Sequence, residues 1–161
     1  MPQKNKNEDG LKRTINDVEI TDPLVLECGE TLTKHEIIYE TYGELNESRS
    51  NAVLICHALS GNHHAAGLNE NGVSGWWDNY IGPGKPIDTN LFHVISITNI
   101  GSCFGSTGPA TINKATGKFW GASFPALEVS DWVKSQKMLM DVLKINTLSL
   151  IHISEPTRLH C

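Results

Sequence analysis

Residues 57–64 hold the densest group of side chains that could do chemistry, and they read His-Ala-Leu-Ser-Gly-Asn-His-His. The segment directly follows the apolar run 52–56, a position where α/β sheets present their ligand-facing loops. A zinc site would use the three histidines, but they lack the spacing of a His-Glu-x-x-His helix and no carboxylate lies between Asn51 and Leu68. A serine–histidine nucleophile is also disfavoured, because Ser60 is not in a Gly-x-Ser-x-Gly elbow.

The third interpretation of this segment is an oxyanion loop. In such a loop, a backbone N–H just after the strand points at the oxygen that becomes negative during acyl transfer. The small residues Ala58 and Gly61 would allow this close approach. The competing structural explanation is that the loop histidines only satisfy local hydrogen bonds.

Two further glycine-containing segments could line a pocket. Residues 75–85 place two adjacent tryptophans beside a Gly-Pro-Gly turn, although core packing alone would also explain the indoles. Residues 101–109 are glycine-rich, as phosphate loops are, but they match neither Gly-x-Gly-x-x-Gly nor Gly-x-x-x-x-Gly-Lys-Ser/Thr. Pro109 also has no N–H to offer a phosphate. A rigid loop that walls a pocket is therefore the preferred interpretation of residues 101–109.

The elements that must position these segments are visible as apolar runs. Residues 52–56 and 91–97 have the pattern of strands buried on both faces. Roughly 35 residues separate them, which is enough for the crossover between parallel strands and too long for a hairpin. We therefore expect these two strands to pair in parallel.

Other segments extend this sheet. Residues 24–26 and 37–42 predict two antiparallel strands at a sheet edge. Ser130 is placed to cap a helix that begins near Asp131 and packs on the sheet. Residues 148–153 then predict a further strand.

The order of these strands and the helix indicates the α/β class, and the composition indicates a globular protein. The chain has 161 residues, of which 39% are hydrophobic and 19% charged, and its formal net charge of −5 opposes a nucleic-acid partner. No apolar run approaches the ~20 residues of a membrane span, so we expect a cytoplasmic protein. The four cysteines lie far apart, which disfavours a zinc cluster. We expect a flexible leader over residues 1–17, one domain over 18–151 and an atypical tail over 152–161.

Residues 57–61, 75–85, 101–109 and 124–133 follow one another in an order and with motifs that closely resemble the homoserine O-acyltransferase family. The resemblance implies an α/β-hydrolase fold, of which this chain would form the amino-terminal part. It also implies a cytoplasmic homodimer that moves an acetyl or succinyl group from acetyl-CoA or succinyl-CoA to L-homoserine in methionine biosynthesis. The acyl-CoA is a co-substrate, and no metal or other cofactor is expected.

The same resemblance implies a mechanism with a serine nucleophile that is activated by a histidine and an aspartate. By motif position, the backbone N–H of Leu59 is one donor of the oxyanion hole. The candidate pocket residues are Ser60, Gly61, Asn62, Trp77, Asp78 and Lys85.

The resemblance ends before the nucleophile. The family continues the strand that matches residues 148–153 into a Gly-Gly-Ser-x-Gly-Gly elbow, whereas Ser154 here is followed by Glu155 and Pro156, which are unsuited to such a sharp turn. The nucleophile, the aspartate and the histidine are therefore expected outside this chain. We expect the chain alone to be an incomplete and inactive fragment.

Two alternatives remain open at this point. The parent protein could be a hydrolase or a serine acyltransferase, because the same oxyanion loop serves water or another hydroxyl as acceptor. A second alternative is a non-catalytic module that binds coenzyme A or a protein partner through Trp76 and Trp77.

Overall fold

The computed structural model describes residues 3–6 and 10–153. The chain divides into two compact units. The first contains the described residues up to 16, residues 39–97 and those from 147 on, and the second contains residues 17–38 and 98–146. The elements in chain order are β1 (Gln3–Lys6), β2 (Lys12–Ile20), β3 (Leu24–Val25), β4 (Thr31–Leu32), β5 (His35–Tyr42), β6 (Ala52–Cys56), β7 (Ile81–Gly82), β8 (Ile87–Asp88), β9 (His93–Ile97), β10 (Ile112–Asn113), β11 (Lys118–Phe119), a 3-10 helix (Gly121–Ser123), α1 (Val129–Val142) and β12 (Leu150–Ile153).

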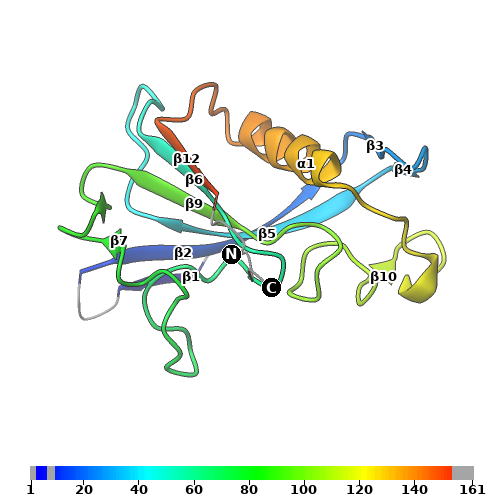
Figure 1. The fold of residues 1–161 in the computed structure, drawn as a ribbon, viewed down its shortest axis with the longest axis horizontal. Coiled ribbons are helices and arrows are strands. Elements are labelled where there is room, and N and C mark those ends of the chain that lie inside the picture. Colours follow the sequence, from blue (N-terminus) through cyan, green and yellow to red (C-terminus); the bar gives the residue numbers. More distant parts are fainter. Residues whose placement is uncertain (1–2, 7–9, 154–161) are drawn as a thin grey trace, which may run out of the picture. The chain divides into compact units, whose positions relative to one another are not determined.

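A six-stranded sheet in the order β1-β2-β5-β9-β6-β12 organises the first unit (Figure 1). β6 runs parallel to β9, with Val53 opposite Val94, and parallel to β12, with Leu54 opposite Ile151. β5 is antiparallel to β9. The parallel pairing expected for residues 52–56 and 91–97 is confirmed, as is a strand within residues 148–153.

The core of the first unit lies against one face of β6. Val53 and Ile55 share that face because side chains alternate along a strand, and burying each such side chain stabilises the fold by roughly 1.5–3 kcal/mol. Two buried alanines and an isoleucine from the long connection between β6 and β9 pack against it, so this core also anchors the connection. Its buried members are Leu11, Tyr42, Val53, Ile55, Ala65, Ala66, Ile81 and Val94.

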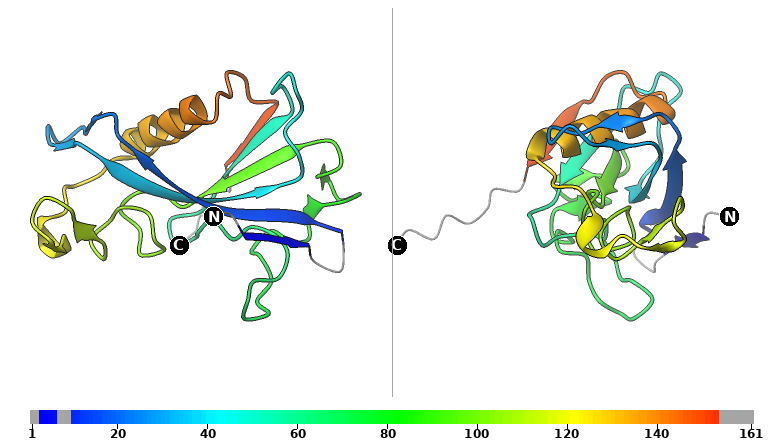
Figure 2. Two further views of the ribbon diagram at one scale, coloured as in Figure 1. Left: turned by 180° about the vertical axis from the view of Figure 1, so that it is seen from behind. Right: turned by 90° about the vertical axis from the view of Figure 1, so that its right-hand side faces the viewer.

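The second unit packs α1 against the β3–β4 hairpin, and the back and side views show α1 next to β3 (Figure 2). Trp132 contributes its ring to the core of this unit and donates its indole N–H to the Ile100 carbonyl at 3.0 Å. The buried centre of this core consists of Leu24, Leu26, Leu32 and Ile100. Within the described part of the chain, no helix is long and apolar enough to cross a membrane.

The start of α1 differs from the expectation. The helix begins at Val129, so Ser130 lies inside its first turn and does not cap it. Glu128 is the N-cap residue and forms a capping box with Asp131, whose carboxylate accepts the Glu128 N–H at 2.9 Å and the Glu27 N–H at 3.0 Å. The Asp131 carboxylate is fully buried and charged, so it binds these main-chain donors more strongly than a serine hydroxyl would.

The flexible leader expected over residues 1–17 is wrong for the described residues of that range. β1 pairs with β2, and the boundary expected after residue 17 falls inside β2. Leu11 and Arg13 are both 3% exposed. The composition of the segment did not predict this strand, because the segment is charged and the burial of Arg13 depends on the carboxylate of Glu40, which is distant in sequence. The tail expected from residue 152 begins inside β12, and Ser154 lies outside the described residues.

The predicted strand pair 24–26 and 37–42 is also wrong in its pairing. β3 pairs with β4 in a separate two-stranded sheet, while β5 lies in the interior of the six-stranded sheet between β2 and β9. The short hairpin is favoured because Gly29 adopts a positive φ of 87° and lets the chain reverse between β3 and β4.

Candidate functional site

The predicted oxyanion loop forms a tight turn at the end of β6. The Gly61 N–H donates to the Ala58 carbonyl at 2.8 Å, so Leu59 and Ser60 occupy the tip of the turn. The Leu59 side chain is 84% exposed. Within the described residues the Leu59 N–H makes no hydrogen bond, and a main-chain donor of this kind is what an oxyanion hole requires.

Gly61 is needed in this turn for steric reasons. A Cβ at this position would lie 2.7 Å from the Cβ of His57, closer than such atoms approach in folded proteins. His57 is itself buried and donates from Nδ1 to the Ala58 carbonyl at 2.6 Å. Burial lowers the pKa of His57, so its ring is neutral at neutral pH. The small residue expected at position 61 is therefore present because the turn packs against His57.

The three histidines of the loop have separate tasks. His57 bonds to its own turn, whereas His64 lies 3.2 Å from Glu40 and 3.0 Å from the Val73 carbonyl. Burial lowers the pKa of His63, while the hydrogen bond to Glu40 raises that of His64. No group of three His, Cys, Asp or Glu side chains within residues 3–6 and 10–153 is arranged to hold a metal ion.

A buried polar cluster lies beneath this loop, and sequence reasoning missed it. Glu40 and Tyr42 project from the same face of β5, and their exposed fractions are 1% and 0%. Arg13 of β2 places Nη1 4.0 Å from Glu40 and donates to the Leu68 carbonyl at 2.9 Å. The opposite charges of Arg13 and Glu40 offset the cost of burying them, because an unpaired charge in the interior is strongly destabilising.

Tyr42 ties the loop to this cluster. Its hydroxyl accepts the N–H groups of Ala65 at 2.8 Å and Ala66 at 3.0 Å, and donates its own proton to Glu40. Burial is the main reason that the pKa of Tyr42 is raised well above its usual value, so the phenol keeps that proton. The signal that could have found this site is the alternation Glu40-x-Tyr42 in an otherwise apolar strand.

The tryptophan segment packs directly on the same loop. Gly75 fits only as glycine, because a Cβ there would lie 2.2 Å from the Ala66 nitrogen. The main chain of Trp77 donates to the Ala65 carbonyl at 2.8 Å. Trp76 donates its indole N–H to the Asn62 carbonyl at 3.0 Å, which brings the predicted pocket residue Asn62 together with the tryptophan segment.

The other predicted pocket residues brace the structure. Trp77 packs against the core of the first unit. Asp78 accepts the Gly67 N–H at 2.7 Å and forms an ion pair with Lys85 at 3.4 Å. Within the described residues, the side-chain hydrogen bonds of Asp78 and Lys85 join them to each other and to Gly67, and none reaches the turn that holds Leu59.

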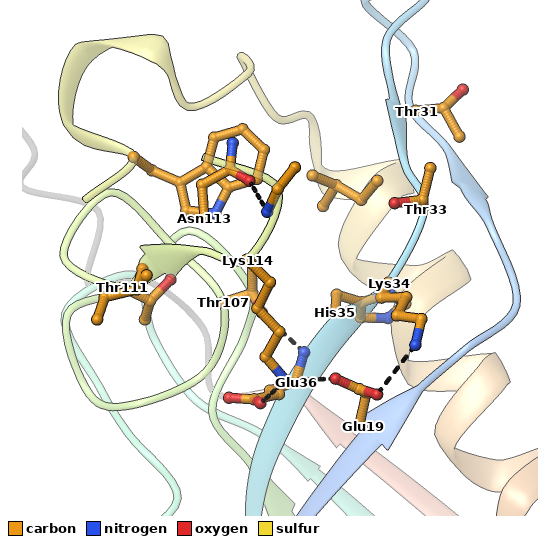
Figure 3. A pocket seen from close by; sticks show the side chains of 14 residues that line it. Glu19, Thr31, Thr33, Lys34, His35, Glu36, Thr107, Thr111, Asn113 and Lys114 are labelled. Carbon is orange, nitrogen blue, oxygen red and sulfur yellow. Dashed lines mark hydrogen bonds and ion pairs between the residues drawn. The ribbon is translucent and has the colours of Figure 1, made fainter. Parts of the chain in front are cut away.

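The glycine-rich segment 101–109 belongs to the second unit, and one of its residues, Thr107, lines a cavity. The Thr107 N–H donates to the Glu36 carbonyl at 2.9 Å and the Thr107 hydroxyl accepts the Glu36 N–H at 2.7 Å, so Thr107 fixes the loop to β5. The cavity measures about 660 Å³. Figure 3 shows Lys114 at its rim, reaching between Glu36 and Glu19.

Comparison with known proteins shows which proteins this chain is similar to. No family model matches the chain. Homoserine O-succinyltransferase of Cellvibrio japonicus is 58% identical over 136 residues, which cover 83% of this chain and 36% of that protein. The chain therefore spans about a third of the length of the curated relatives it matches.

Solved structures agree. Homoserine O-acetyltransferase from Bacillus anthracis matches with a TM-score of 0.80 and 35% identity, over 89% of this chain and 40% of the other. Esterase E22 matches with a TM-score of 0.80 and 36% identity, over 89% and 41%. These neighbours and the mixed sheet show a partial α/β-hydrolase fold. The chain belongs to the homoserine O-acyltransferase family.

Proposed function

We propose that this chain forms part of a homoserine O-succinyltransferase, which moves a succinyl group from succinyl-CoA to the hydroxyl of L-homoserine. The observation that carries the proposal is the turn after β6, where the Leu59 N–H is left without a hydrogen-bond partner within the described residues. Curated relatives that are 58% and 63% identical are named homoserine O-succinyltransferases, which supports succinyl over acetyl as the donor group.

In the proposed mechanism this chain contributes charge stabilisation and positioning. An acyl transfer passes through a tetrahedral intermediate whose oxygen becomes negative, and the Leu59 N–H donates to that oxygen. One such donor is worth about 2.7–4 kcal/mol of transition-state stabilisation. The family resemblance assigns the serine nucleophile, the histidine and the aspartate to residues outside this chain. We therefore expect the chain alone to show no turnover.

Ser60, Gly61 and Asn62 retain their proposed place at the mouth of the pocket, because they belong to the Leu59 turn or directly follow it. Asp78 and Lys85 act on the pocket indirectly. They hold the Gly67 main chain, and thus the loop that ends in the turn. Trp77 supports the same loop from the core side.

A chimera tests the function. The residues of the Cellvibrio japonicus enzyme that align with this chain are replaced by the residues of this chain, and transfer from succinyl-CoA to L-homoserine is measured by release of free thiol. We expect the rate of the chimera to lie within about tenfold of the host enzyme, because 58% of the aligned residues are identical and cores tolerate exchanges that keep volume and pattern. A folded chimera that releases no thiol would contradict the proposal.

The second candidate is an ester hydrolase, and it is favoured by the structural match to esterase E22. The two functions differ in the acceptor, since a hydrolase passes the acyl group to water. Competition among L-homoserine, L-serine and water, measured on the full-length protein from the same locus, separates them. Products dominated by free succinate at saturating L-homoserine would favour the hydrolase.

We also propose a cytoplasmic, homodimeric parent enzyme that acts in methionine biosynthesis. The family resemblance alone supports these three points. Sedimentation of the full-length protein tests the oligomeric state, and a monomer across micromolar concentrations would contradict it.

A further inference from the structure

The ring of His64 faces two acceptors at once. Nδ1 lies 3.2 Å from the Glu40 carboxylate and Nε2 lies 3.0 Å from the Val73 carbonyl. A carboxylate and a carbonyl only accept, so both hydrogen bonds form together when the imidazole carries a proton on each nitrogen. The contacts to Glu40 and Val73 are thus satisfied together by a cationic His64.

A second partner for the same nitrogen lies close by. Arg13 Nη1 is 3.4 Å from His64 Nδ1. When His64 is cationic these two groups repel each other, and Glu40 holds the ring. When His64 is neutral and keeps its Nε2 proton on the Val73 carbonyl, Nδ1 becomes an acceptor and Arg13 becomes its available donor. The cluster thus has two distinct hydrogen-bonding states that differ by one proton.

His64 is connected to the candidate oxyanion loop through the main chain. Its N–H donates to the Asn62 side chain at 2.9 Å, and the Asn62 carbonyl accepts the Trp76 indole N–H at 3.0 Å. Asn62 directly follows Gly61, whose N–H closes the Leu59 turn at 2.8 Å. The main chain of His64, which carries the ring, is therefore linked to the turn through Asn62 and Gly61.

Solvent protons can reach this cluster. A cavity of about 290 Å³ is lined by Arg13, Glu40 and His64, and also by Asn62, His63 and Glu70. Within the described structure, the charged and titratable groups around His64 are Arg13, Glu40, His63 and Glu70, together with Tyr42, which bonds to the same Glu40 oxygen. Glu40 dominates, since it is the only carboxylate among them with a direct hydrogen bond to the ring in the described structure.

We propose that His64 is a positioning residue whose doubly protonated ring holds the Leu59 turn in place, and that loss of one ring proton transfers Nδ1 from Glu40 to Arg13 and loosens the turn. The consequence for catalysis rests on the proposed acyltransferase function, whereas the two states of the cluster do not. The hydrogen bond to Glu40 also raises the pKa of His64 above its usual 6.5, which is the direction that two acceptors require.

Nuclear magnetic resonance on the labelled chain tests the proposal. The ring carbons of His64 and the amides of Leu59 and Gly61 are followed from about pH 5 to about pH 9, a range that brackets ordinary histidine titration. We expect the ring midpoint to lie above 6.5 and the two amides to shift with the same midpoint. A ring midpoint at or below 6.5, or amides that ignore the His64 titration, would overturn it.

Variants separate the pair from its surroundings. Glu40→Gln removes the charge and should lower the His64 midpoint by about one pH unit or more, since a carboxylate in contact moves a pKa by about 1–3 units. His63→Gln removes another ring at the same cavity and should leave the His64 midpoint within about 0.3 pH units, because a neutral neighbour contributes little. If Glu40→Gln does not fold, the wild-type titration still decides. None of these measurements needs acyl transfer, so failure of the proposed function would leave their outcome unchanged.

Discussion

Replacing Tyr42 by phenylalanine removes one buried hydroxyl and leaves the ring in the core. That hydroxyl accepts the N–H groups of Ala65 and Ala66 at 2.8 Å and 3.0 Å and donates to Glu40. Tyr42, Ala65 and Ala66 each have an exposed fraction of 0%, so water cannot take over these bonds without a local opening. The variant therefore leaves the N–H groups of Ala65 and Ala66 without an acceptor, and it removes one hydrogen-bond donor from the buried Glu40 carboxylate.

The expected cost follows from these three losses. A buried donor without a partner costs about 1–3 kcal/mol. Two such donors, with partial relaxation of the loop, give a loss of about 3 kcal/mol in the free energy of unfolding. This is a large fraction of the roughly 5–15 kcal/mol that stabilises a typical domain.

Urea denaturation of the chain, followed by the fluorescence of its four tryptophans, measures this loss. Tyr80→Phe is the matched control, because Tyr80 is 50% exposed. We expect the control to change the free energy of unfolding by less than about 0.5 kcal/mol, as exposed substitutions do. A Tyr42→Phe loss no larger than that of the control would refute the assigned role of the hydroxyl.

Three further predictions concern the same framework. Gly75→Ala forces a Cβ to within 2.2 Å of the Ala66 nitrogen and should cost about 3 kcal/mol or more in urea denaturation, with Ser74→Ala as a neutral control. Asp78→Asn keeps the acceptor for the Gly67 N–H at 2.7 Å and should cost less than about 1 kcal/mol, whereas Asp78→Ala strands that N–H and should cost about 2 kcal/mol; equal losses would contradict the bracing role. Burial lowers the pKa of His35 from 6.5 to about 4, so between these pH values the unfolded chain binds a proton at His35 that the folded chain does not bind. Stability from this group is therefore lost as the pH falls from about 6.5 to about 4, by roughly 3 kcal/mol. Thermal melts of His35→Leu should show a flatter acid limb, and an unchanged limb would contradict this.

The parts of the fold that the sequence predicts are those set by continuous apolar runs. Ala52–Cys56 and His93–Ile97 are buried along almost their whole length, and a strand with two covered faces needs no partner to be recognised. Pairing is harder to predict. The Leu24 segment forms a local hairpin because Gly29 reverses the chain between β3 and β4. The hydrophobic periodicity of these two strands does not predict this pairing.

The candidate site divides in the same way. The Leu59 turn could be predicted, because its small residues and its place after a buried strand are local features. The cluster of Arg13, Glu40, Tyr42 and His64 could not, because it joins three segments that are distant in sequence. Arg13 lies in a stretch whose polar composition indicated a loose leader, and only the partner carboxylate explains its burial.

The comparison of two proline variants in the chimeric enzyme tests the role of Leu59 most directly. Leu59 and Glu47 each occupy the second residue of a tight turn, closed at 2.8 Å by Gly61 and at 3.0 Å by Arg49, and proline is favoured at that position. Leu59→Pro removes the proposed oxyanion donor and should lower kcat by about 10²–10³-fold with an unchanged urea midpoint. Glu47→Pro removes an N–H of no proposed function and should keep kcat within about twofold, since exposed substitutions of this kind change little. Equal kcat values for the two folded variants would contradict the assignment of the Leu59 N–H to the oxyanion hole.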